Sequence, residues 1–143
     1  MRRVVSIVGC EEAKFTPATK EAALRWIYVL LLGADEACSG ECHLGGIDIW
    51  TKEVAAEMGI PFKGFPPREL GWEHGYKPRN LQIASYGTEC HCITVATLPA
   101  TYTSPWRFER CYHCDADHVK SGGCWTVKQA RKMRKDPTSV IVV

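Results

Sequence analysis

Cysteine and histidine are concentrated in one stretch near the end of this chain of 143 residues. Cys111 and Cys114 are separated by two residues, and His118 and Cys124 follow after gaps of three and five residues. Two cysteines at this spacing on a tight turn present two thiolates to one Zn²⁺, and a short loop can add two further ligands to complete a tetrahedral site. The pattern therefore predicts a structural zinc ion held by these four side chains.

Two alternatives for the cysteines stay open at this stage. Cys90 and Cys92 lie two residues apart on a predicted strand, just before the cluster, and are alternative partners for Cys111 and Cys114. Cys124 belongs both to the metal pattern and to a glycine-rich loop, so it could face a metal or a ligand. Without a metal the thiols would be buried and reduced, which is common for cysteine and is the interpretation favoured for Cys10, Cys38 and Cys42.

Three glycine-containing segments could bind an anion. They are Gly9, the loop Ser39–Gly46, and the sequence Ser121-Gly122-Gly123-Cys124-Trp125-Thr126. Glycine lets backbone amides approach a phosphate without an intervening Cβ, and the N-terminus of a following helix adds a favourable dipole. The hydroxyls of Ser39, Ser121 and Thr126 could donate further hydrogen bonds. Because all three segments follow a predicted strand or open a predicted helix, they could converge on one phosphorylated ligand.

The positioning elements follow from hydrophobic periodicity and from glycine and proline boundaries. Strands are predicted at Val4–Val8, Glu36–Cys38, Ile60–Phe65, Cys90–Thr97 and Val140–Val143, and helices after Thr16 or Thr19, at Ile47–Met58, from Pro78 through Ala84, and at Trp125–Arg134. Residues 71–77 are predicted as a loop, and about 98–120 as an irregular, Cys/His-rich and zinc-binding insertion before the last helix. This alternation predicts an α/β, Rossmann-like three-layer fold with a mostly parallel sheet of about five strands. In such a sheet, ligands bind beyond the carboxyl ends of the strands.

The order of these motifs resembles that of the SLOG superfamily, which joins the DprA/SMF proteins with the lysine-decarboxylase-like LOG proteins, and in particular its YspA-like branch. The resemblance covers nearly the whole chain except roughly residues 98–115. It rests on Ile7-Val8-Gly9, Cys38-Ser39-Gly40, Leu44-Gly45-Gly46-Ile47-Asp48, Gly59-Ile60-Pro61, Pro66-Pro67, Lys77-Pro78-Arg79-Asn80 and Ser121–Thr126. It implies a single Rossmann-like domain over residues 1–143 that binds a nucleotide or a nucleotide derivative, often as a sensor.

The resemblance also implies a set of site residues. By position, the pocket would be lined by Gly9, Ser39, Gly40, Gly46, Asp48, Arg79, Asn80, Gly122, Gly123 and Thr126. Cys10, Gly45 and Ser121, from the same segments, complete the predicted ligand site. Asp48 could accept a hydrogen bond from a ligand hydroxyl or only favour its helix dipole, and Arg79 could pair with phosphate or form a salt bridge.

Turnover of the ligand is the principal alternative to binding alone. LOG proteins hydrolyse nucleoside monophosphates, and their late loop has the sequence PGGxGT, followed after two residues by a glutamate needed for catalysis. Here Ser121 replaces the proline, Trp125 replaces the last glycine, and Gln129 stands at the position of the glutamate. Because a glutamine cannot act as a carboxylate base, these departures favour binding without turnover.

Composition limits the remaining classes. The net charge of +2 gives no overall field for nucleic acid, although a zinc-dependent nucleic-acid contact through the basic last helix is a further alternative. The longest apolar run, Trp26–Leu32, is too short to span a membrane, so a cytoplasmic location is expected. Self-association through helix faces that carry Trp26, Tyr28 and Leu31 is a possible further property.

Overall fold

The computed structural model describes residues 2–103, 111, 114 and 117–143. Its five strands are β1 (Val4–Gly9), β2 (Glu36–Gly40), β3 (Phe62–Phe65), β4 (Glu89–Thr94) and β5 (Thr138–Val142). Its α-helices are α1 (Pro17–Leu31), α2 (Ile47–Glu57), α3 (Lys77–Tyr86) and α4 (Gly122–Lys132), with a 3₁₀ turn, η1 (Glu12–Lys14), and a π-helical turn, η2 (Trp72–Tyr76). Every strand pair in the sheet is parallel. The predicted α/β, Rossmann-like fold is thus confirmed.

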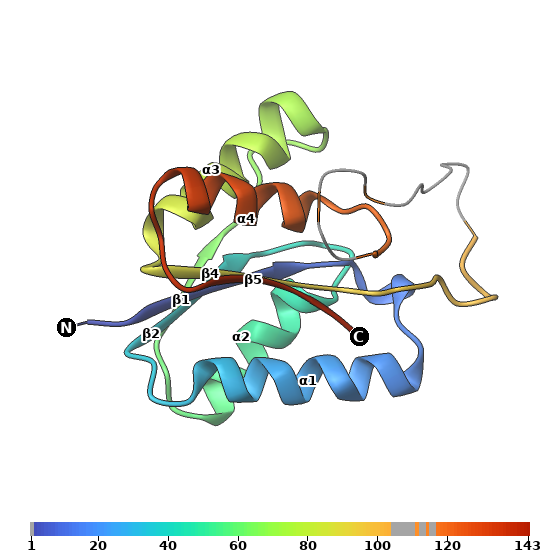
Figure 1. Cartoon of the computed structure of the whole chain (residues 1–143), viewed down its shortest axis with the longest axis horizontal. Helices are drawn as coiled ribbons and strands as arrows, with labels where there is room; N and C mark the ends of the chain where they lie inside the picture. Colours follow the sequence, from blue (N-terminus) through green and yellow to red (C-terminus); the bar gives the residue numbers. More distant parts are fainter. Residues whose placement is uncertain (1, 104–110, 112–113, 115–116) are drawn as a thin grey trace.

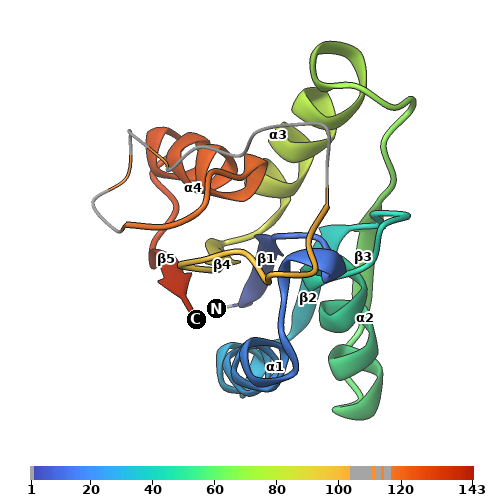
Figure 2. The same cartoon turned by 90° about the vertical axis from the view of Figure 1, so that its right-hand side faces the viewer.

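The sheet forms the middle of three layers (Figures 1 and 2), with α1 and α2 on one face and α3 and α4 on the other. Side chains along β1 point alternately to the two faces of the sheet and pack into the core on each face, as expected for a strand that is buried on both sides. Val5 and Ile7 belong to the core packed under α1 and α2. Val4 and Val8 belong to the core under α3 and α4.

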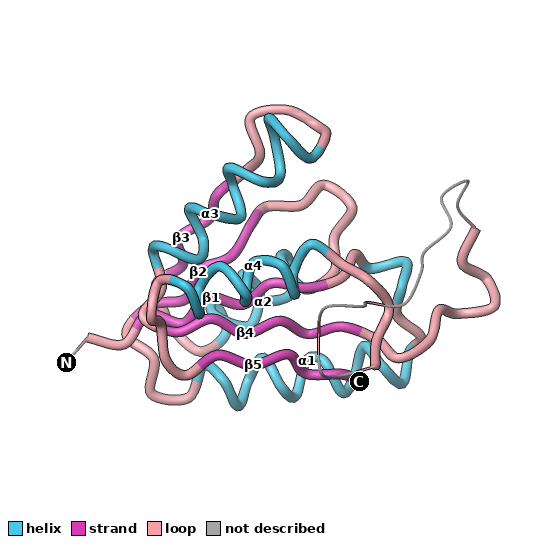
Figure 3. The backbone as a smooth tube through the Cα atoms, turned by 45° about the horizontal axis from the view of Figure 1, so that its top comes forward, coloured by secondary structure: helices cyan, strands magenta, loops and turns pink. Residues whose placement is uncertain are grey.

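The strand order β3-β2-β1-β4-β5 creates a switch point in the middle of the sheet (Figure 3). The chain builds outward from β1 to β3, then crosses back to place β4 on the other side of β1. Successive crossovers therefore leave β1 and β4 in opposite directions, which opens a crevice at the carboxyl ends of these two strands. Gly9, the last residue of β1, pairs with Ile93 of β4 at this edge.

Three predicted boundaries were wrong in an informative way. Residues 71–77 do not form a simple loop: Trp72–Tyr76 is a π-helical turn, in which the amide of Tyr76 donates to the carbonyl of Gly71 at 2.9 Å, and it leads directly into α3. The last helix begins at Gly122 rather than at Trp125. The third strand begins at Phe62 rather than at Ile60. A short π-helical turn, and a helix whose first residues are glycines, lack the hydrophobic periodicity that predicts helices from sequence.

Part of the predicted insertion at about 98–120 lies outside the described residues, namely 104–110, 112–113 and 115–116. Cys111, Cys114 and residues 117–120 are described, and the amide of Val119 donates to the carbonyl of Val95 at 2.9 Å, next to the end of β4. In the part of the chain that the structure describes, no helix is long and apolar enough to cross a membrane.

A partly buried polar network links Arg3, the residue before β1, to β4 and β5. Arg3 donates two hydrogen bonds to the carboxylate of Glu89, at 3.1 and 2.8 Å. Glu89 lies 3.2 Å from Nε2 of His91, and Nδ1 of His91 lies 2.7 Å from Oγ of Ser139. Burial by itself would raise the pKa of Glu89, but hydrogen bonds from Arg3 and His91 outweigh it and lower that pKa. Burial lowers the pKa of His91, against the opposing effect of Glu89.

Both shifts make the free energy of unfolding decrease in acid. A lowered pKa in the folded state means that the unfolded chain binds more protons. Stability is therefore lost as pH falls from the unfolded-state pKa, about 6.5 for His91 and about 4.5 for Glu89, through the lower folded-state pKa of each group. We expect Glu89→Gln to cost about 1–3 kcal/mol at pH 7 and to flatten the acid limb below pH 5. Urea unfolding at pH 4 to 8 measures this, with the exposed Glu57→Gln as the control. An unchanged acid limb in Glu89→Gln would contradict the assignment.

Candidate functional site

A pocket of about 380 Å³ opens at the switch point between β1 and β4. Four segments form its wall. They are the end of β1 and the residues after it (Val8, Gly9, Cys10, Glu11, Lys14), the segment before and in α2 (Cys42, Leu44, Gly45, Asp48), η2 and α3 (Trp72, Tyr76, Arg79, Asn80), and the start of α4 (Ser121, Gly122, Gly123). This volume lies in the range of small-molecule sites, and the position is where parallel sheets bind ligands.

A buried ion pair forms part of the wall. Oδ2 of Asp48 lies 3.5 Å from Nη1 of Arg79, and both side chains are only 8% exposed. Ser39 donates to Oδ1 of Asp48 at 3.1 Å, and Nε of Arg79 donates to Oδ1 of Asn80 at 2.8 Å. Burial raises the pKa of Asp48, while Arg79 and Ser39 act in the opposite direction. Arg79 therefore forms a salt bridge, one of its two alternatives from the sequence, and it also lines the pocket. Its pairing with phosphate stays a prediction.

Gly40 makes room for this pair. A Cβ on Gly40 would lie 2.1 Å from Nη1 of Arg79 and 2.5 Å from Oδ2 of Asp48. Any larger residue would have to displace the guanidinium or the carboxylate from its partner. Gly40 thus leaves the space in which the ion pair forms, and it does not itself line the pocket.

The N-terminus of α4 faces the pocket through Ser121, Gly122 and Gly123. The N-cap residue, Ser121, forms no side-chain capping hydrogen bond to the helix, whose first turn carries no acidic residue. Gly123 packs tightly: a Cβ added at this position would lie 2.7 Å from Sγ of Cys92 and 3.2 Å from the backbone of Gly9. The glycine pair therefore brings the positive end of a helix of 11 residues directly to the end of β1.

The structure brings nine of the thirteen predicted ligand residues into the wall of this pocket and leaves four outside it. Ser39 and Gly40 lie beneath the wall, where they support Asp48 and Arg79. Gly46 packs against the backbone of Cys10 and Glu11, and the hydroxyl of Thr126 donates to the carbonyl of Gly122 within its own helix at 2.9 Å. Contact with a ligand stays a prediction for all thirteen.

Seven wall residues are not among the thirteen predicted ligand residues: Val8, Glu11, Lys14, Cys42, Leu44, Trp72 and Tyr76. Lys14 is 7% exposed, although a lysine in a surface turn is normally solvated. The signal that could have found Lys14 and Glu11 is their position directly after the first strand, at the edge where ligands bind. Cys42, interpreted as a buried thiol, is only half-buried and lines the pocket.

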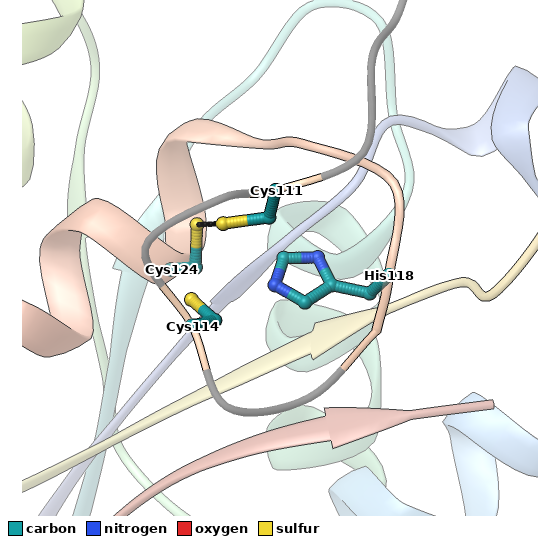
Figure 4. A group of neighbouring side chains, drawn as sticks. All are labelled: Cys111, Cys114, His118 and Cys124. Atoms are coloured by element: carbon teal, nitrogen blue, oxygen red, sulfur yellow. Dashed lines mark hydrogen bonds between the residues drawn. The ribbon is translucent and has the colours of Figure 1, made fainter.

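The second candidate site is the cysteine and histidine cluster (Figure 4). The ligand atoms of Cys111, Cys114, His118 and Cys124 all lie within 4.8 Å of one another. Sγ of Cys111 lies 3.8 Å from Sγ of Cys124. Two thiolates bound tetrahedrally at about 2.3 Å from one zinc ion would be separated by about 3.8 Å. The described residues thus group the four predicted ligands and leave Cys90 and Cys92 outside the group.

The imidazole of His118 is prepared to bind a cation. Its Nδ1 lies 2.6 Å from the carbonyl oxygen of Val119, so Nδ1 carries the proton and Nε2 presents a lone pair. His118 is fully buried, and Nε2 has no hydrogen-bond partner among the described residues. The imidazole points toward the three sulfur atoms in Figure 4. This orphaned nitrogen fits a metal ligand whose orientation is fixed by its second ring nitrogen.

Burial raises the pKa of Cys124 to about 12 and also raises that of Cys114. Thiols that are this hard to ionise stay protonated unless a cation compensates the charge, because a bound metal deprotonates its thiol ligands. The cluster could therefore hold a metal ion.

Fold and sites together define a Rossmann-like α/β protein with a pocket at the switch point and a Cys₃His cluster beside it. No family model matches the sequence, and no curated protein matches it either. Among solved structures, the molybdenum cofactor carrier protein MCP from Chlamydomonas reinhardtii is similar, with a TM-score of 0.62 and 14% sequence identity. The match covers 98% of this chain and 76% of that chain, and at this identity it supports the fold alone.

Proposed function

We propose that this chain is a single SLOG-like domain that binds a phosphorylated, nucleotide-derived small molecule in the pocket between β1 and β4. The observation that carries the proposal is the N-terminus of α4, which faces the pocket through Gly122 and Gly123 and carries no acidic residue in its first turn. The backbone amides of such a turn bind phosphate well, because they and the helix dipole both favour a negative charge.

The other walls suit the remainder of such a ligand. Trp72, Tyr76 and Leu44 supply apolar surface against which a base could pack, and Asp48 supplies a carboxylate for a hydroxyl group. The similar carrier protein is named for a molybdenum cofactor, which supports a small-molecule ligand in a fold of this kind. Nucleotide chemistry rests on the resemblance to SLOG proteins and on the pocket itself.

We propose binding without turnover. Gln129 stands where LOG proteins have their catalytic glutamate, and it is not among the residues that line the pocket. The carboxylate of Asp48 is engaged by Arg79 and Ser39. Incubation with nucleoside monophosphates should release no free base. Base release by the wild type that Gly122→Asp abolishes would instead establish the alternative, a nucleosidase or phosphoribohydrolase.

Native mass spectrometry with a panel of nucleotides and ADP-ribose-like compounds tests the ligand class. We expect Gly122→Asp to reduce the affinity for the bound compound at least tenfold, because a carboxylate would occupy the phosphate position. An aspartate in the first turn favours its helix by about 0.3–1 kcal/mol, so the variant should fold. A Cβ there meets its nearest neighbour, Trp72, at 3.3 Å, which is tight but tolerable.

Lys128→Asp is the matched control, since Lys128 is exposed on the same helix and outside the pocket wall. It also introduces an aspartate but should leave affinity unchanged. Equal affinity in wild type and Gly122→Asp would refute the phosphate position at α4. Failure of the whole panel to bind would refute the nucleotide-derived ligand.

We also propose that the Cys₃His cluster holds one structural Zn²⁺. Three thiolates and one imidazole form a common donor set of closed tetrahedral zinc sites, and soft sulfur ligands disfavour magnesium and calcium. The separation of the Cys111 and Cys124 sulfur atoms and the orphaned Nε2 of His118 both fit this ion.

A further inference from the structure

The metal cluster and the ligand pocket share structural elements. Cys124 follows directly after Gly123 in the first turn of α4. Its thiol donates to the carbonyl of Ser121 at 3.1 Å, and a bound metal would replace this hydrogen bond, because it deprotonates the thiol. Ser121 and Gly123 belong to the pocket wall. Any restraint on Cys124 therefore acts on the first turn of α4, which forms the proposed phosphate site.

A second connection runs from His118 to Cys10, in another segment of the pocket wall. Its Nδ1 donates to the carbonyl of Val119, which also accepts a hydrogen bond from the hydroxyl of Thr94 at 3.2 Å. Since the Thr94 proton is used there, the thiol of Cys10, 3.1 Å from Oγ1 of Thr94, is the donor in that contact. Cys10 lines the pocket, and its carbonyl accepts from the amide of Ile47, at the start of α2, at 3.1 Å.

From these two connections we propose that metal occupancy of the Cys₃His cluster controls the ligand affinity of the pocket. The bound metal fixes Cys124 and His118 relative to each other, and through them the first turn of α4 and Cys10. In the metal-free chain both walls of the pocket fluctuate more, and a ligand must order them when it binds. A metal-loaded chain has already lost that conformational freedom, which makes the two binding events cooperative.

Cooperativity of this kind is reciprocal and has a typical size. Coupling between two sites changes affinity about 5–150-fold, and each ligand changes the affinity for the other by the same factor. We expect zinc to tighten nucleotide binding on the order of tenfold. The inference rests on the proposed function for its ligand, but the change in the pocket wall needs no ligand to be observed.

Hydrogen–deuterium exchange of the full chain tests the coupling without a ligand. Zinc-loaded protein is compared with protein that was stripped by a chelator under reducing conditions. We expect zinc to slow exchange at Gly9–Cys10 and at Gly122–Gly123 as well as next to the ligands, while Tyr28–Leu31 at the end of α1 stays unchanged. Zinc binding that leaves exchange at both pocket segments unaltered would overturn the proposal, as would failure to bind zinc.

Variants separate metal binding from transmission. Cys114→Ser removes one partly exposed ligand and should abolish the zinc response, whereas His74→Ala, a histidine outside the cluster, should retain it. Thr94→Val keeps all four ligands but removes the hydroxyl between Val119 and Cys10. It should bind zinc and protect Gly122–Gly123, but it should lose the protection at Cys10. Full protection at Cys10 in Thr94→Val would overturn the second connection.

Calorimetric titration of AMP into the zinc-loaded chain and into the metal-free chain measures the effect of zinc on ligand affinity. About tenfold tighter binding to the zinc-loaded chain supports the coupling, and equal affinity overturns it. If AMP binds neither form, that result counts against the proposed function, and the exchange experiment alone decides the coupling.

Discussion

Asp48→Ala is expected to destabilise the folded chain by about 3–5 kcal/mol, because it leaves the guanidinium of Arg79 buried without its carboxylate partner. Arg79 is 7% exposed, and its contacts to Asn80, to the carbonyl of Phe65 and to the ring of Tyr76 carry no full negative charge. Domains of this size have about 5–15 kcal/mol of stability in total, so the variant should unfold at a much lower urea concentration. Tryptophan fluorescence during urea unfolding measures the difference.

A double variant distinguishes loss of the ion pair from loss of packing. Asp48→Ala combined with Arg79→Met removes both charges, and buried ion pairs replaced by apolar side chains are often no less stable. We therefore expect the double variant to recover most of the stability that Asp48→Ala loses. A single variant within 1 kcal/mol of wild type would show instead that water in the pocket solvates Arg79.

The Asp48–Arg79 ion pair shows why the sequence predicts the fold in more detail than the geometry of the site. Parallel strands buried on both faces leave runs such as Val4–Val8, and α1 begins with a capping pair, Thr16 and Thr19, that a sequence displays directly. The space that holds the guanidinium of Arg79 has no such local signal in the sequence. It depends on the missing Cβ of Gly40, which is distant in sequence and meets the guanidinium only after β2 and α3 have packed.

Gly122 and Gly123 belong to a glycine motif that the sequence identifies, but their predicted local structure is wrong. The last helix is predicted to begin at Trp125, which leaves Gly122 and Gly123 in a loop. Glycine in a helix costs about 1 kcal/mol relative to alanine. In the structure both are helical, and at Gly123 only a residue without a Cβ lets α4 approach Gly9 and Cys92. Tertiary packing outweighed propensity, and it placed the helix N-terminus nearer to the pocket than a loop would have done.

The metal pattern was easier to predict, because ligand spacing along a short segment is a local property. Cys111, Cys114, His118 and Cys124 fall within 14 consecutive positions, so few conformations of the segment can separate them widely. What spacing could not predict is the link from His118 through Val119 and Thr94 to Cys10. That link joins residues far apart in the chain, and it places the cluster next to the pocket.

Removal of zinc is expected to lower the melting temperature of the chain substantially. With free zinc at about a thousand times its dissociation constant, binding to the folded state alone contributes about 4 kcal/mol. For a domain of this size that corresponds to a fall of roughly 8–16 °C when a chelator strips the metal. Because thiol ligands must lose protons to bind, the zinc-dependent part of the shift should shrink as pH falls from 8 to 6.

Scanning calorimetry with and without chelator measures the shift, and two substitutions assign it to the cluster. His118→Ala and Cys114→Ser should each remove most of the zinc-dependent part. Cys42→Ser, which alters a half-buried thiol outside the group of four, should keep it. The orphaned Nε2 of His118 makes its variant the decisive one, since a buried imidazole with no partner is costly unless a metal occupies that nitrogen. If chelator leaves the melting temperature of the wild type unchanged while His118→Ala still folds with equal stability, the cluster is a set of packed thiols rather than a metal centre.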